Sequence, residues 1–501
     1  MKSYIKTKIL FCFTVLTVIT SCELANDLDD YEPLYSLPAE DAIYDESSAE
    51  LALAGVYSTL QGNGNYQLSR LTNSLSGMSQ NPVTAIFAGG LPPEEQSFAV
   101  NDPISDGSML LTIYTGQYTL INRANWLIEQ ASELSDDVFP TPNRREEIIG
   151  EAKILRAFGH FQLLRLFGQF YNLDSEYGIN VRLSPAKSGE VQPRNTVSET
   201  YDAIINDLED GISSAPELIA KYYVNKTFAK GLLAKVYMYM GNYNEAAILA
   251  QEVINNSGSN FQLLPSFEAL FDHQSVDVFN NNSSLFNLYS DQDDEPIYYG
   301  NEWTIYSNFS SAVATMATTE TVNISGQIIN YDATRVPFML TGAPLLPFPG
   351  LNGNMKYRQQ TGGHETFYFL RMAEIYLIYA ECEARNTNSV TTDALEALNA
   401  IRIRAGATST GGNGFETYPQ TISLEQFLEV VRKEKRIELA TEQGEDWFDL
   451  IRYDYIDGFG SGFQVSNVKP TATNSDKFIM PIPFASIEVG NEIIKQNPSY
   501  K

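Results

Sequence analysis

The 501-residue sequence predicts a mainly α protein in which stacked helical pairs pack against an irregular, loop-rich region with minor β structure. Three observations support this fold class. Apolar residues recur with a period of 3.6 in many segments from Ser47 onward, as in amphipathic helices. Small residues share one face in neighbouring helical segments. Two long regions, about 61–107 and 257–365, are rich in Gly, Asn, Ser and Pro, and regions that long are usually functional or carry short strands.

The periodic segments define the expected helices in chain order. They cover residues 47–60, 108–134, 143–168, 198–214, 226–240, 243–256, 366–386, 391–405 and 423–443. The long polar regions interrupt this series after the first helix and after the sixth. We therefore expect helical pairs with irregular insertions between them, in one domain that covers residues 47–501.

The clearest helical pair is "KTFAKGLLAKVYMYMGNYNEAAILAQEVI" at 226–254. Ala234, Tyr237 and Gly241 are spaced three and four apart and so share one face of the first helix. Ala246 and Ala250 share a face of the second, and small residues there allow close approach of two antiparallel helices. This pattern resembles a tetratricopeptide unit, whose helices bury their faces by stacking on neighbouring units. The three-and-four spacing recurs in "FLRMAEIYLIYAECEARN".

The N-terminus has the plan of a secretory signal peptide over residues 1–21. Lys2, Lys6 and Lys8 form a charged region, and residues 9–19 form an apolar run too short to span a bilayer. No later segment is apolar enough to span one, so we expect membrane attachment only through the N-terminus.

Cys22 follows this apolar run directly. The stretch "ITSC" at 19–22 resembles the lipobox of bacterial lipoproteins, in which the cysteine sulfur carries a diacylglyceryl group and the signal is cut just before it. Two or three acyl chains anchor a protein firmly, whereas one chain alone binds marginally. Residues 22–46 then form an acidic tether, and its acids Glu23, Asp27, Asp29 and Asp30 resemble a surface-export signal. Cys382 would be the only cysteine left in the body, where we expect it to be buried and inert.

The charge excludes one class of partner. The formal net charge is −29, and a chain starting at Cys22 would carry 30 basic against 62 acidic residues, or −32. Such a chain repels phosphate backbones at long range, so we expect no nucleic-acid binding. A hydrophobic content of 43% excludes a disordered chain.

Four segments carry characteristic residues in a fixed order. These are Glu151, Ala152, Leu155, Arg156, Ala157, Phe158, Phe167 and Gly168 in "EAKILRAFGHFQLLRLFG"; Asn399, Arg402, Arg404, Ala405 and Gly406 in "ALNAIRIRAG"; Arg436, Glu438, Glu442, Gly444, Trp447, Asp449, Leu450 and Arg452 in "EKRIELATEQGEDWFDLIRY"; and the ending "IMPIPFASIEVGNEIIKQNPSY". Together they resemble the SusD/RagB family of Bacteroidetes outer-membrane lipoproteins. Three departures are Ser499 in place of Gly, Asp446 in place of Arg, and "GQFY" at 168–171 without a Pro. They affect local details of the match.

The resemblance implies a cell-surface, lipid-anchored protein of the outer membrane that takes part in nutrient uptake. Members of the family bind oligosaccharides, or sometimes peptides, and deliver them to a SusC-like TonB-dependent transporter on which they sit as a lid. Their fold carries tetratricopeptide-like helices on one side and a loop-rich side that holds the ligand. A peptide ligand and a scaffold that binds only proteins stay open as alternatives.

Sugar binding requires flat aromatic rings beside amide, carboxylate and guanidinium groups. The "YSDQDDEPIYYGNEWTIYSNF" stretch is the richest in these groups, and the 65–106 stretch is second. The candidate ligand-binding residues are Tyr66, Arg70, Phe98, Asn101, Tyr298, Tyr299 and Trp303. For any one of these aromatics, packing under a long loop is the alternative. The helix-borne aromatics, among them Tyr239 and Trp447, are assigned to packing, and Arg402, Arg404 and Arg452 to ion pairs or helix caps.

The sequence contains no motif for catalysis, a metal or a cofactor, and we expect a binding protein and not an enzyme. "DQDDE" at 291–295 could hold Ca²⁺, but it lacks EF-hand spacing and a turn glycine, so a solvated acidic loop is the preferred interpretation. His160, His273 and His364 are too scattered for a zinc site or a triad. Counting acids alone does not exclude a glycosidase, which would need one carboxylate pair.

Overall fold

The computed structural model describes residues 42–76, 93–187, 189, 191–256, 258–271, 279–289, 319–340, 355–356, 367–409, 412–456, 463–490 and 493–500. The helices are α2 (Glu46–Tyr57), α3 (Asn63–Ser76), α5 (Pro93–Ala99), α6 (Ser108–Glu133), α7 (Arg144–Phe167), α8 (Val197–Ser214), α9 (Lys226–Met240), α10 (Tyr243–Asn256), α13 (Arg335–Met339), α14 (Met372–Thr387), α15 (Thr392–Arg404), α16 (Leu424–Glu438), α17 (Glu445–Ile456) and α18 (Phe484–Gly490). The strands are β1 (Ser284–Asn287), β2 (Thr321–Ile324), β3 (Gln327–Asn330) and β4 (Tyr368–Arg371). The mainly α fold class with minor β structure is confirmed.

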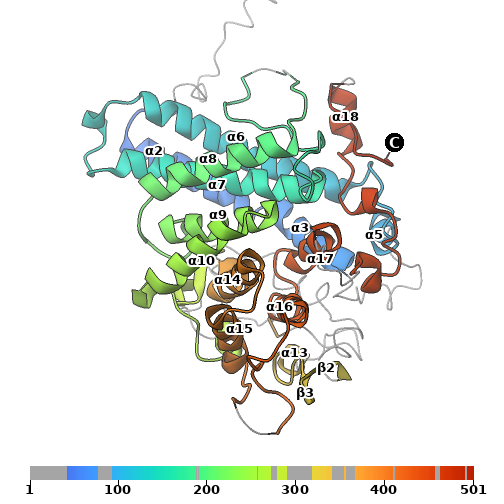
Figure 1. The fold of residues 1–501 in the computed structure, drawn as a ribbon. Coiled ribbons are helices and arrows are strands. Elements are labelled where there is room, and N and C mark those ends of the chain that lie inside the picture. The colour runs from blue at the N-terminus through green and yellow to red at the C-terminus, as the bar shows by residue number, and fades with distance from the viewer. Residues whose placement is uncertain are drawn as a thin grey trace, which may run out of the picture.

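The helices stack in chain order along a curved path. Helix α7 packs on α6 and α8, α8 on α9, α9 on α10, α10 on α14, and α14 on α15 and α16 (Figure 1). The predicted pair at 226–254 is confirmed, with Ala234, Ala246 and Ala250 fully buried between the helices. Asn225 begins α9, because its side chain accepts a hydrogen bond from Phe228 N at 2.9 Å.

Strands β1 and β4 form a short antiparallel pair, and this corrects one prediction. Residues 368–371 were expected to begin a helix at 366, but they form β4, and α14 starts only at Met372. Both strands are buried at every residue, and a short, fully buried strand cannot be distinguished by periodicity from the end of a buried helix. Strands β2 and β3 form a separate hairpin.

Five of the described helices were not among those predicted, namely α3, α5, α13, α17 and α18. Helices α3 and α5 lie inside the 61–107 region that was expected to be irregular. Asn, Ser and Gly lower the helix propensity of α3, but Leu68, Leu71 and Leu75 are fully buried on one face, so packing outweighs propensity. The helix expected at 423–443 ends at Glu438, and α17 follows after Gly444, which has a φ of 72°.

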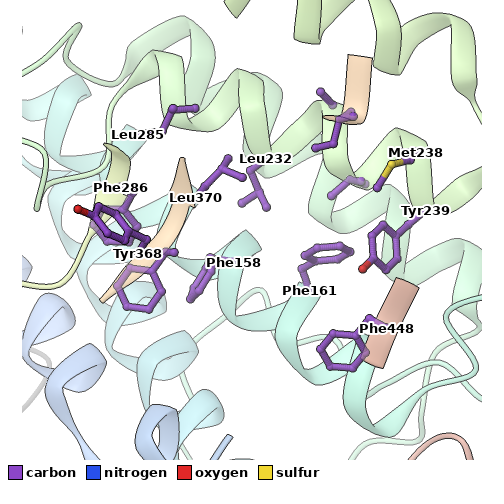
Figure 2. Packing of buried hydrophobic residues seen from close by; sticks show 14 of the residues in the cluster. Phe158, Phe161, Leu232, Met238, Tyr239, Leu285, Phe286, Tyr368, Leu370 and Phe448 are labelled. Carbon is purple, nitrogen blue, oxygen red and sulfur yellow. The ribbon is translucent and has the colours of Figure 1, made fainter. Parts of the chain in front are cut away.

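The hydrophobic core joins elements that are far apart in sequence (Figure 2). Phe158 of α7 and Phe286 of β1 both pack against Phe369 of β4, with ring centroids 5.3 and 4.8 Å apart. Phe161 of α7 meets Tyr239 of α9 at 5.4 Å. In Figure 2, Phe158 and Leu232 lie toward Leu370 of β4, whereas Phe161 and Tyr239 lie toward Phe448 of α17. Trp447 and Cys382 are fully buried, as predicted.

Buried ion pairs join α15 to α16 and α17 to α14. Arg402 contacts Glu434 at 3.3 Å, Arg404 contacts Glu438, and Arg452 contacts Glu381 at 2.6 Å. All three arginines are at most 8% exposed. Their predicted assignment to ion pairs is therefore confirmed, and these matched residues hold the helices together.

Candidate functional site

A continuous row of aromatic rings includes Tyr289, the last described residue before the 290–318 segment. The row runs from Phe279 through Tyr289, Tyr222 and Tyr223 to Tyr57, and we call these five residues the tyrosine row. Successive ring centroids are 4.7, 4.9, 4.9 and 5.1 Å apart. Phe279 is buried, whereas all four tyrosines are partly exposed.

Three separate elements supply the row. Tyr57 is the last residue of α2, and Tyr289 comes two residues after β1. Tyr222 and Tyr223 lie in the link between α8 and α9, and this link is fastened to β1 by a hydrogen bond from Asn287 N to the carbonyl oxygen of Lys221 at 3.0 Å. The rings therefore meet because β1 is held against the α8–α9 link.

A hollow of about 330 Å³ adjoins one end of the row, and Tyr57 and Tyr223 form part of its wall. Arg144 crosses it. The Arg144 guanidinium donates to both carboxylate oxygens of Glu50, at 2.5 and 3.0 Å, and to Glu151 Oε1 at 2.9 Å. The Tyr57 hydroxyl donates to Glu151 Oε2 at 2.6 Å and accepts a hydrogen bond from Val224 N at 3.0 Å.

The Glu151 carboxyl is the electrostatic centre of this hollow. Burial raises its pKa to about 7 and outweighs the hydrogen bond from Tyr57 and the attraction of Arg144, which lower it. Burial, and then the charge of Glu151, raise the pKa of the Tyr57 hydroxyl well above its ordinary value. Glu50 is the more exposed acid, with 43% of its side chain accessible. The hollow thus combines an exposed carboxylate and a guanidinium with the edges of two aromatic rings.

Two of the predicted ligand residues are buried, which corrects their expected role. Phe98 is 0% exposed, and its carbonyl oxygen accepts a hydrogen bond from Lys469 Nζ at 2.7 Å. Asn101 is 4% exposed and donates from Nδ2 to the carbonyl oxygen of Lys477 at 3.2 Å. Because Phe98 has no exposed face, it offers a sugar no surface for stacking. Its role is packing in the core, which was the alternative interpretation for any single aromatic residue.

The other predicted residues are only partly described. Tyr66 and Arg70 lie on α3, which packs against α5 and α6, but their side chains lie outside the described part of the chain. Tyr298, Tyr299 and Trp303 fall in the 290–318 segment, which also lies outside it, as do Cys22 and the acidic 291–295 stretch. These assignments stay predictions.

The tyrosine row itself was missed. The sequence offers two signals for it. One is the consecutive pair Tyr222-Tyr223 in the break between two helices, and the other is Tyr289, the first residue of the "YSDQDDEPIYYGNEWTIYSNF" stretch. Tyr57 at a helix end lies outside both candidate stretches. The proximity of these rings arises from tertiary packing.

His160 has a structural role in α7. Its Nε2 accepts a hydrogen bond from Arg182 N at 3.2 Å, and burial lowers its pKa to about 3, so the ring is neutral. Within the described ranges, no three His, Cys, Asp or Glu residues gather as a metal site would require. Over the same ranges, no helix is both long and apolar enough to cross a bilayer.

Comparison with known proteins supports the resemblance to one family. The SusD family model matches residues 291–500, and a related model described as "starch-binding associating with outer membrane" matches residues 92–238. Over these two stretches the chain is similar to the SusD/RagB family. The structure explains why Gly is usual in the family where this chain has Ser499. Ser499 adopts a φ of 61°, in the left-handed region that favours Gly, and its hydroxyl donates to Asp476 Oδ2 at 2.6 Å.

Relatives align with almost the whole of this chain. A SusD-like protein of Formosa agariphila is 24% identical over 539 aligned residues, which span 99% of this chain and 100% of that one. A solved SusD homologue of Bacteroides thetaiotaomicron superposes with a TM-score of 0.70 at 20% identity, covering 94% and 100% of the two chains. A solved laminarin-binding SusD-like protein gives 0.63 at 20% identity, covering 91% and 100%. These structures share the fold.

Proposed function

We propose that this protein captures oligosaccharide at the outer face of the outer membrane and delivers it to a SusC-like TonB-dependent transporter. The observation that carries the proposal is the tyrosine row, together with Tyr298, Tyr299 and Trp303 of the adjoining segment. The starch-binding description of one matching family model and the laminarin-binding relative add support.

The binding mechanism is non-covalent. The apolar C–H faces of sugar rings stack on the partly exposed tyrosines of the row. This contact removes apolar surface of both partners from water, and the rigid rings lose little conformational freedom. Sugar hydroxyls donate to the exposed Glu50 carboxylate. Transfer to the transporter needs no chemical step, and we propose no catalytic residue.

A calorimetric titration of the chain lacking residues 1–22 tests this proposal against a panel of oligosaccharides and peptides. Tyr222→Ala and Trp303→Ala are expected to weaken binding of the preferred glycan about tenfold each, which corresponds to about 1.4 kcal/mol. Tyr455→Ala is the matched control, because Tyr455 is 52% exposed and pairs with Tyr171 at 4.8 Å outside the row.

The outcomes separate the alternatives. Unchanged affinity in both variants contradicts the ligand site, and binding of peptides with no glycan bound shifts the ligand class. Binding of neither leaves the protein-scaffold alternative, which predicts contact through the helical stack. Co-purification from outer membranes with a TonB-dependent transporter tests the partner.

We further propose that Cys22 carries the lipid anchor. Cys22→Ala is expected to abolish labelling by radioactive palmitate and to release the protein from the membrane fraction. Replacing Glu23, Asp27, Asp29 and Asp30 by alanine is expected to keep the lipid but to protect the protein from protease added to intact cells. If the variant with all four replacements stays sensitive to the protease on intact cells, these acids have no role in export.

A further inference from the structure

A second cavity, of about 420 Å³, lies apart from the tyrosine row, between α6, the 180–191 segment and α18. Figure 1 shows α18 near the C-terminus, beyond the loop that links α7 and α8. No residue of the tyrosine row lines this cavity. The larger apolar residues of its wall are Tyr114, Tyr118, Ile121, Val191, Val489 and Ile494. A cavity of this volume and lining suits a small organic molecule.

Arg182 brings a positive charge to this wall. Among the described residues that line the cavity, it alone is charged at neutral pH, and no carboxylate lines the cavity with it. Its backbone is fixed by two helices, because its N–H donates to His160 Nε2 of α7 at 3.2 Å and its carbonyl oxygen accepts from Asn125 Nδ2 of α6 at 3.1 Å. The residue is partly exposed. The fold thus holds a guanidinium-bearing residue at the edge of an apolar cavity.

A second guanidinium, that of Arg194, lies close to the same wall. It donates to the backbone carbonyl oxygens of Gly178, Lys495 and Phe167 at 2.6–3.0 Å, and no carboxylate in the described part of the chain forms an ion pair with it. Burial lowers the pKa of Arg194 to about 10, so the group stays charged at neutral pH. Its charge is therefore balanced by dipoles and not by an acid.

The two tyrosines of the wall feel both cations. Burial raises the pKa of the Tyr114 and Tyr118 hydroxyls, whereas the charges of Arg194 and Arg182 act to lower it. The potential at this wall thus favours negative charge, although the chain as a whole carries a formal charge of −29. An apolar cavity with a positive edge discriminates by charge as well as by shape.

We propose that this cavity binds a small organic anion that joins an apolar body to one carboxylate, and that the Arg182 guanidinium donates to this carboxylate. A guanidinium matches a carboxylate in geometry and carries enough N–H donors to keep its other partners as well. The apolar wall takes the body of the molecule and disfavours a saturated sugar, whose many hydroxyls would lack partners there.

Ligand-observed NMR titration of the chain lacking residues 1–22 with 2-naphthoate, 2-naphthamide and acetate tests the proposal. The amide has the ring system without the charge, and acetate has the charge without the ring system. We expect 2-naphthoate to bind about tenfold more tightly than 2-naphthamide, the size of one hydrogen bond to a charged group. Acetate is expected not to bind at millimolar concentration.

Arg182→Met removes the guanidinium and keeps an apolar stem. We expect this variant to bind the two naphthyl probes equally. Arg123→Met is the matched control, because Arg123 is also next to the wall in sequence, on α6, but is exposed and donates to the Gly55 carbonyl oxygen and to Ser58 Oγ outside the cavity. This control is expected to keep the preference for 2-naphthoate.

Ala485→Leu gives a second test that leaves every charge in place. Ala485 lies on α18, is exposed and lines the cavity, so a larger side chain narrows the cavity without disturbing the core. We expect this variant to lose 2-naphthoate binding and to keep oligosaccharide binding. Ala54→Leu, which narrows the hollow beside Tyr57, is the reciprocal control and is expected to leave 2-naphthoate binding unchanged.

Four results would each overturn the proposal. They are absence of 2-naphthoate binding at millimolar concentration, equal affinity of the unaltered chain for 2-naphthoate and either other probe, an equal preference in Arg182→Met and Arg123→Met, and full binding by Ala485→Leu. Because the oligosaccharide titration is a separate measurement, failure of this site does not count against the proposed function, nor the reverse.

Discussion

Gln61 donates a hydrogen bond from Nε2 to the backbone carbonyl oxygen of Tyr289 at 3.2 Å. The two residues are 228 positions apart in the sequence. Gln61 opens the 61–107 region and Tyr289 directly precedes the 290–318 segment, so the two regions predicted to hold ligand start side by side. This contact holds the backbone of Tyr289, the second ring of the tyrosine row.

Gln61→Ala is expected to weaken oligosaccharide binding about threefold to tenfold, because a hydrogen bond of this kind contributes about 0.5–1.5 kcal/mol to holding Tyr289 in place. The melting temperature is expected to change little, because Gln61 is partly exposed. Gln262→Ala is the control, since the Gln262 side chain makes a similar bond to the Gly258 carbonyl in another loop. Equal affinity of the two variants, measured by calorimetric titration, contradicts a positioning role for Gln61.

The sequence predicted elements best where local chemistry marks their ends. Helices 226–240 and 243–256 match to the residue, because Asn225 caps the first and Gly241 separates the two. Strand β4 was missed because its identity depends on pairing with Ser284–Asn287, which lies far upstream. Pairing over such distances leaves no periodic mark in a four-residue run.

The candidate site was harder to predict for the same reason. Composition drew attention to residues 65–106, yet Phe98 there is core. The partly exposed rings of Tyr57 and Tyr222 lie outside both candidate stretches, and Tyr289 is only the first residue of the other one. An aromatic-rich loop and an aromatic core look alike in sequence. The contact between the α8–α9 link and β1, which the sequence does not reveal, brings Tyr222 and Tyr223 beside Tyr289.

Glu442→Ala is expected to destabilise the protein by about 3–5 kcal/mol, the range for removing one partner of a buried ion pair. Arg371 donates from Nε to Glu442 Oε2 at 2.7 Å and from Nη2 to Oε1 at 3.0 Å, and Lys356 Nζ donates to Oε1 at 2.6 Å. Removing the carboxylate takes away the shared partner of two buried cations, Arg371 and Lys356. Urea denaturation measures the change, and Glu176→Ala, which breaks the exposed pair with Lys495, is expected to leave the midpoint unchanged. Similar midpoints for the two variants would contradict this assignment.

Gly241→Ala is expected to destabilise the protein by about 1–2 kcal/mol, because Gly241 has a φ of 80° and L-residues are strained in that region. No atom lies within 4 Å of a Cβ added there, so the effect isolates backbone conformation. Gly55, inside α2, also has open space around it but no positive φ. Gly55→Ala is therefore expected to stabilise the protein by about 0.5–1 kcal/mol. Thermal denaturation should give shifts of opposite sign, and shifts of the same sign refute the conformational explanation.

Stability is expected to fall as pH rises from about 4.5 to 7, in part because of Glu151. Burial raises the pKa of its carboxyl from 4.5 to about 7 in the folded protein. Between these values the folded state holds a proton that the unfolded state has released, so raising the pH favours unfolding. A shift of this size corresponds to on the order of 3 kcal/mol at pH 7 and above.

Glu151→Gln is expected to reduce this pH slope, because glutamine cannot titrate yet still accepts a hydrogen bond from the Tyr57 hydroxyl. Part of the slope is expected to persist, since burial also raises the pKa of Glu374. The measurement is the free energy of unfolding in urea at half-unit steps from pH 4.5 to 7.5, with Glu176→Gln as an exposed control that keeps the full slope. A Glu151→Gln curve parallel to that control across the range would show that Glu151 is ionised in the folded protein throughout, and that Arg144 outweighs burial.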